Sequence, residues 1–71
     1  MDAQTAIRNA YTLGQRAAKA RRQHDESRAS AEREAFRGFR RMYPEATIGL
    51  QPAELETHYG DGYRDEMHGV S

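Results

Sequence analysis

The sequence contains no cysteine, no tryptophan and only two prolines. Without cysteine the chain can form neither a disulfide framework nor a thiolate zinc site, the usual supports of so small a domain. Only eight of the 71 residues are Val, Ile, Leu or Phe, a share below the roughly 20% that, with high net charge, is typical of disordered chains. The net charge is zero, however, so charge repulsion does not keep the chain expanded. We therefore expect a small helical domain stabilised by association with a partner or a second copy.

Long apolar runs are also missing. No stretch approaches the roughly 18 consecutive apolar residues of a membrane-spanning helix. The first residues carry no basic segment followed by an apolar one, so we expect no signal peptide. These features predict a cytoplasmic protein without membrane partners, located in the host cytoplasm if a bacteriophage encodes it.

The zero net charge conceals an uneven distribution. Residues 1–44 carry ten basic and five acidic side chains, whereas residues 45–71 carry one basic and six acidic side chains. Five of the six glycines and both prolines lie at or beyond Gly38. We predict a single domain over residues 1–71, with a basic helical hairpin over 1–44 and an acidic C-terminal segment over 45–71. Two interpretations remain open: the halves neutralise each other, or a basic face stays exposed.

Small apolar residues recur at helical spacing over residues 3–22, after Asp2 as a plausible N-cap. The stripe predicted to serve helix packing or self-association consists of Ala3, Ile7, Ala10, Leu13, Gly14 and Ala17. Alanine and glycine bury little apolar surface but let another helix approach closely. Because the core is small, we expect a homodimer or a higher oligomer.

A second periodic stretch covers residues 27–43 and should end at Tyr43-Pro44. Residues 24–27 offer N-cap side chains but neither Gly nor Pro, so a tight antiparallel hairpin and one long coiled-coil helix both remain open. We favour the hairpin, because a coiled coil would place the polar Arg21, His24 and Arg28 in its seam.

A short third helix is predicted over residues 52–59. Pro52 suits the first helical position, Glu54 the first turn, and Gly60 the position after the helix end. Residues 61–69 should form a frayed acidic tail or one further turn. The sequence therefore predicts an all-α fold, a hairpin followed by a short helix.

No motif for catalysis or cofactor binding is present. The nearest candidate for a metal site is a loose acidic and histidine-containing group formed by His58, Asp61, Asp65, Glu66 and His68. Its spacing fits neither a zinc nor a calcium site. The chain also lacks a nucleophile elbow and a glycine-rich phosphate loop. We therefore expect no enzyme activity, no metal and no cofactor.

The sharpest feature is a row of four arginines on the second helix. We call Arg33, Arg37, Arg40 and Arg41 the arginine row; on an α-helix they project within an arc of about 100°. A secondary basic face on the first helix consists of Arg8, Arg16, Lys19 and Arg22. Such a row can bind phosphates or an acidic protein surface. It can also be a solvated helix face without a binding role.

Two short segments resemble the ribosome modulation factor family. They are Ala10, Gly14, Ala17 and Arg22 in the first helix, and the run Gly62-Tyr63-Arg64-Asp65-Glu66-Met67. Together they cover less than a third of the chain. The segment between them is longer than in that family, and tyrosines stand where the family has tryptophans, so we infer no membership.

These patterns favour a non-enzymatic protein that binds a protein partner as a stoichiometric inhibitor or adaptor, as bacteriophage proteins do with host machinery. The alternative is a nucleic-acid or ribosome-binding protein that places the arginine row on phosphates. We expect the protein partner first, because a neutral chain with an acidic half lacks the surplus positive charge of most nucleic-acid binders.

Overall fold

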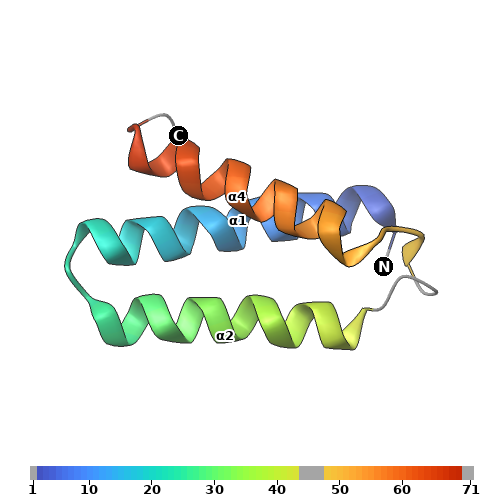
Figure 1. The fold of residues 1–71 in the computed structure, drawn as a ribbon, viewed down its shortest axis with the longest axis horizontal. Coiled ribbons are helices and arrows are strands. Elements are labelled where there is room, and N and C mark those ends of the chain that lie inside the picture. Colours follow the sequence, from blue (N-terminus) through green and yellow to red (C-terminus); the bar gives the residue numbers. More distant parts are fainter. Residues whose placement is uncertain (1, 44–47, 70–71) are drawn as a thin grey trace.

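The computed structural model describes residues 2–43 and 48–69, and within these ranges it contains three helices. They are α1 (Ala3–Arg22), α2 (Glu26–Met42) and α4 (Pro52–Met67). Helices α1 and α2 form an antiparallel hairpin, and α4 returns beside α1 in the same direction (Figure 1). Helix α1 packs against both of the others and is the central element. The predicted all-α hairpin followed by a third helix is confirmed.

The hairpin turn is built around His24. This residue adopts a φ of +58°, in the left-handed region where glycine or asparagine is usual. The Asp25 N–H donates to the Ala20 carbonyl at 2.9 Å, and the Asp25 side chain accepts from the Arg28 N–H at 3.0 Å. The turn therefore closes α1 and caps α2 without glycine or proline, and the single long helix is excluded. Helix α2 ends at Met42; Pro44 lies outside the described residues.

Helix α4 begins as expected but extends further. Pro52 is its first residue, and the Gln51 N–H donates to Glu54 Oε2 at 3.2 Å, as in a capping box. The helix then continues through Gly60 to Met67, about two turns beyond the predicted end. The glycine that follows its C-terminus is Gly69, with a φ of +75°. Contacts of this extension with α1 explain why it is helical rather than frayed.

The α1–α4 interface is a close backbone contact at two glycines. A Cβ atom on Gly14 would overlap the Tyr59 carbonyl, and one on Gly62 would overlap the Tyr11 carbonyl. Each helix thus presents a glycine to the backbone of the other. A hydrogen bond lies beside this contact: the Tyr11 hydroxyl donates to Asp65 Oδ2 at 2.5 Å. This hydrogen bond is the main reason that the pKa of Tyr11 is raised above 10.

Three of the six residues of the predicted small-residue stripe are buried within the folded chain. Ala10, Gly14 and Ala17 are buried, while Ala3, Ile7 and Leu13 are half-buried. Three further alanines of α1 are buried with them: Ala6, Ala18 and Ala20. The buried part of the stripe is thus covered by the same chain and does not require a second copy. The oligomeric state stays a prediction.

An ion pair with one buried partner joins α2 to α1. Glu32 is only 7% exposed, and its Oε1 accepts from Arg16 Nη2 at 3.0 Å. The rest of the core is small: Phe36, Ile48 and Leu55 pack with the alanines of α1. The ion pair therefore supplements a small apolar contact between the two helices.

The two-glycine contact predicts opposite effects for two substitutions in one helix. Gly62→Ala should lower the free energy of unfolding by about 1 to 3 kcal/mol, because the methyl group must push α1 and α4 apart. Gly60→Ala is the control: nothing lies within 4 Å of its Cβ position. It should raise the free energy of unfolding by about 0.5 to 1 kcal/mol through helix propensity. Denaturant unfolding followed by circular dichroism measures both, and an increase for Gly62→Ala would contradict the interface.

The ion pair predicts a second stability difference. Arg16→Gln leaves the buried Glu32 carboxylate without its charged partner and should lower the free energy of unfolding by about 1 to 2 kcal/mol. Arg64→Gln is the matched control, because Arg64 pairs with Asp61 one turn away on the surface of α4. It should change stability by less than about 0.5 kcal/mol. Equal effects in urea unfolding would show that Glu32 does not depend on Arg16.

Two tyrosines predict a loss of stability at alkaline pH. The pKa of Tyr11 is raised above 10 by its hydrogen bond to Asp65, and that of Tyr59 is raised above 10 by burial. Above pH 10 the unfolded chain loses these protons while the folded protein retains them, so the free energy of unfolding decreases as the pH rises. Urea unfolding at a series of alkaline pH values should show a shallower decrease for Tyr11→Phe. An identical pH dependence in the variant would exclude a role for this phenol.

Candidate functional site

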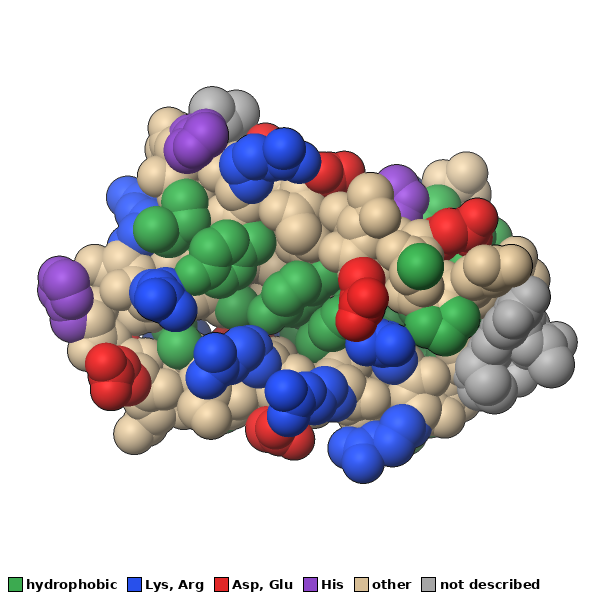
Figure 2. All heavy atoms as spheres, in the orientation of Figure 1, with side chains coloured by type: hydrophobic (Ala, Val, Ile, Leu, Met, Phe, Trp, Pro, Cys, Tyr) green, Lys and Arg blue, Asp and Glu red, His purple; other side chains and the backbone are tan. Residues whose placement is uncertain are grey.

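The arginine row lies along the side of α2 that borders α4. Arg33, Arg37 and Arg41 are exposed, and Arg40 is half-buried. Arg37 pairs with Glu34, one turn away on the surface, at 2.9 Å. Among the residues described, Arg33 and Arg41 form no hydrogen bond or ion pair. Figure 2 shows the result, a line of Lys and Arg side chains along α2.

Arg40 differs from the other three because it forms a contact between two helices. Its Nη1 donates to Glu56 Oε1 of α4 at 2.6 Å, and its guanidinium carbon lies 5.8 Å from the Phe36 ring centroid. Its Nε–H is buried without a hydrogen-bond partner among the described residues. Arg40 therefore holds α4 against α2. Arg33 and Arg41 are the exposed cations of the row, and Arg37 is exposed in a surface ion pair with Glu34.

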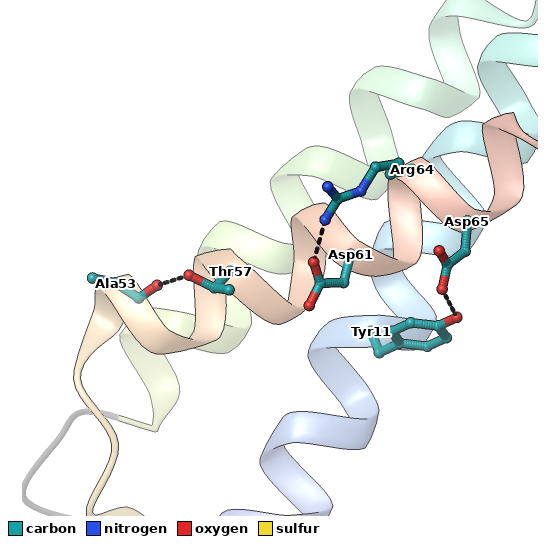
Figure 3. Close-up of polar contacts among 6 residues, drawn as sticks. All are labelled: Tyr11, Ala53, Thr57, Asp61, Arg64 and Asp65. Atoms are coloured by element: carbon teal, nitrogen blue, oxygen red, sulfur yellow. Dashed lines mark hydrogen bonds and ion pairs between the residues drawn. The ribbon is translucent and has the colours of Figure 1, made fainter.

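The acidic C-terminal segment does not neutralise the row. Asp61 pairs with Arg64 at 2.5 Å within α4, Asp65 accepts from Tyr11, and Glu66 pairs with Arg22 at 3.3 Å. Figure 3 shows Asp65 directed toward α1 while Asp61 and Arg64 pair along the surface of α4. Among the described acidic residues of this segment, Glu56 alone reaches the row, at Arg40. The charge of the exposed row is therefore largely uncompensated by this segment.

The secondary basic face is divided by the fold. Arg16 and Arg22 are held in ion pairs that tie α1 to α2 and to α4. Arg8 and Lys19 stay exposed on α1. The structure thus assigns half of this predicted face to structural ion pairs, which leaves the arginine row as the stronger candidate.

A groove runs between α2 and α4 beside the row. We call it the α2–α4 groove; it consists of three hollows in succession along α2. The first, of about 780 Å³, lies at the hairpin end. Arg21, Arg22 and His24 line it from the end of α1 and the turn, Arg33 lines it from α2, and Met67 lines it from α4. The second shares Arg33 with the first, and the third shares Arg37 and Arg40 with the second. Each hollow therefore has at least one arginine of the row on its α2 side.

The wall of the second hollow is aromatic. The sequence pattern alone does not predict a binding site at these aromatic residues. Phe36 and Tyr59 line this hollow, and their rings stack with centroids 4.2 Å apart. Burial raises the pKa of the Tyr59 hydroxyl above its usual value. In the sequence, the spacing of both residues indicates a position in or near the core. Only the position of α4 beside α2 places them in a groove.

Within residues 2–43 and 48–69, no three His, Asp or Glu side chains are grouped so that they could hold a metal ion. None of the described helices has a stretch long and apolar enough to cross a membrane. Comparison with protein families, curated proteins and solved structures finds no match to this chain.

Proposed function

We propose that the protein is a non-enzymatic binding protein that places its arginine row on the phosphates of a nucleic acid. The observation that carries the proposal is the exposure of Arg33, Arg37 and Arg41 on one face of α2, away from the acidic groups of residues 61–66. Exposed guanidinium groups bind phosphate oxygens through paired hydrogen bonds. This binding releases the counterions that surround the nucleic acid. Such a face binds polyanions even though the whole chain is neutral.

This distribution changes the order of the two partner classes expected from composition. The neutral net charge favoured a protein partner, because surplus positive charge drives non-specific binding to nucleic acids. The acidic side chains of α4 that cause this neutrality are mostly engaged with Tyr11, Arg22 and Arg64. The local charge of the α2 face therefore supports nucleic acid as the first candidate.

An acidic protein surface is the second candidate, bound by an inhibitor or adaptor. Met42 and Met67 favour it, because they are 70% and 42% exposed and methionine and arginine are enriched at protein interfaces. These residues end α2 and α4, respectively, and so lie toward opposite ends of the molecule (Figure 1). They do not form one apolar patch, so we rank this candidate below nucleic acid.

The proposal predicts a site-specific loss of RNA binding. Changing Arg33, Arg37 and Arg41 together to Gln should weaken binding to RNA of any sequence. It should also reduce the logarithmic salt slope by about 0.7 to 0.9 for each phosphate that the variant no longer neutralises. Glutamine keeps the helix propensity, so α2 should remain folded. Fluorescence anisotropy with labelled RNA at several salt concentrations measures both effects.

The control removes the same charge elsewhere. Arg8, Lys19 and Arg28 are exposed and line none of the three hollows of the groove; changing all three to Gln should leave most of the RNA affinity. Equal decreases in affinity for the two triple variants would assign binding to net charge rather than to the row. Failure of the wild type to bind RNA, together with row-dependent binding to polyglutamate, would replace nucleic acid by an acidic protein as the partner.

A further inference from the structure

We infer that the α2–α4 groove holds an unpaired nucleic-acid strand, with its phosphates on α2 and its bases against the aromatic wall. This inference rests on the proposed binding of nucleic acid by the arginine row and adds the form of nucleic acid that the site selects. It is carried by the shape of the groove, by the different chemistry of its two sides, and by the aromatic pair in its wall.

The shape of the groove fits a linear polymer better than a small molecule. Its three hollows follow one another along α2 and share arginines where they meet: Arg33 joins the first two, and Arg37 and Arg40 join the last two. A single compact ligand would need one closed pocket with convergent polar groups. A row of connected open hollows, each with arginine on the α2 side, instead repeats a cationic group along its length, as a polynucleotide repeats its phosphates.

The two sides of the second hollow differ as the two edges of a single strand differ. Arg33 and Arg37 line it from α2, and Tyr59 lines it from α4, where Figure 2 shows hydrophobic side chains between the helices. Glu56 of α4 also lines this hollow, and its carboxylate is paired with Arg40. A single strand has phosphates along one edge and unstacked bases along the other. A duplex presents phosphates on its outside and keeps its base faces stacked inside, so its bases cannot reach the apolar side. Charge complementarity and the asymmetry therefore select an unpaired strand.

The aromatic wall supplies the contact for a base. Tyr59 is half-buried and lines the second hollow beside Phe36, and Arg33 and Arg37 line the same hollow from α2. Stacking of a base on an aromatic side chain is sequence-tolerant, because every base has a π face. Phe36 supports the Tyr59 ring from one side at a centroid distance of 4.2 Å. The ring is thus held in place before a strand binds, which reduces the entropic cost of binding.

Competition between matched RNAs tests the inference. The wild-type protein is titrated with a labelled single strand, with the duplex formed from the same strand, and with a strand of the same length that has a sugar–phosphate backbone but no bases. We expect the intact single strand to bind about tenfold more tightly than the baseless strand, and more tightly than the duplex, because neither of these can stack a base on Tyr59. All three ligands carry the phosphates that the row would bind.

A variant localises this preference to the groove. Tyr59→Leu keeps an apolar side chain next to Phe36 but removes the stacking ring, and it should reduce the single-strand preference about tenfold without changing the salt slope. Tyr43→Leu is the control, because Tyr43 packs against Phe39 and lines none of the three hollows. Thermal unfolding of both variants verifies that they fold, and the comparison of intact with baseless strand in the wild type does not depend on them.

The outcomes separate the inference from the function on which it rests. Equal affinity for the single strand, the duplex and the baseless strand, with all three affinities reduced in the triple variant of the row, would overturn the inference and leave nucleic-acid binding intact. Absence of binding to every RNA would overturn both. A preference for the intact single strand that Tyr59→Leu abolishes and Tyr43→Leu retains would support the groove as its site.

Discussion

The close contact of α1 and α4 at Gly14 and Gly62 is the constraint on which the rest of the structure depends. Each glycine faces a backbone carbonyl of the other helix, where no side chain fits. With so few large apolar residues, the chain cannot hold its helices together by the bulk of its core. The close approach of α1 and α4 compensates for the small core, because it brings many backbone and alanine atoms into van der Waals contact over a small area. It also brings Tyr11 within hydrogen-bonding distance of Asp65.

The same contact determines the distribution of charge on the surface. Because α4 lies along α1, Asp65 and Glu66 are directed to Tyr11 and Arg22 rather than to the arginine row. Helix α2 is held to α1 by the buried Glu32 and to α4 by Arg40, and Arg33, Arg37 and Arg41 remain exposed beside these links. A chain of zero net charge therefore carries a face that is locally basic. Net charge describes its average behaviour, but the local face determines what it can bind.

The groove follows from the way in which the three helices pack. Helix α1 packs against both neighbours, whereas α2 and α4 meet through side chains such as Phe36 and Tyr59. Two helices that share a central partner in this way leave a channel between them. In this protein one side of the channel is lined by arginine and its wall contains stacked aromatic rings. This combination is the physical basis of the binding site that we propose.

The sequence by itself determined the helical class, the two long helices and the start of the third, because helical periodicity, Asp2 and Pro52 act through local interactions. It also placed the four arginines on one face, since that follows from helix geometry alone. Only the tertiary structure decided that α4 continues past Gly60, that Gly14 packs on a helix of the same chain, and that Phe36 and Tyr59 line a groove. These features depend on contacts between residues far apart in the sequence, and such contacts override local signals such as a helix-ending glycine.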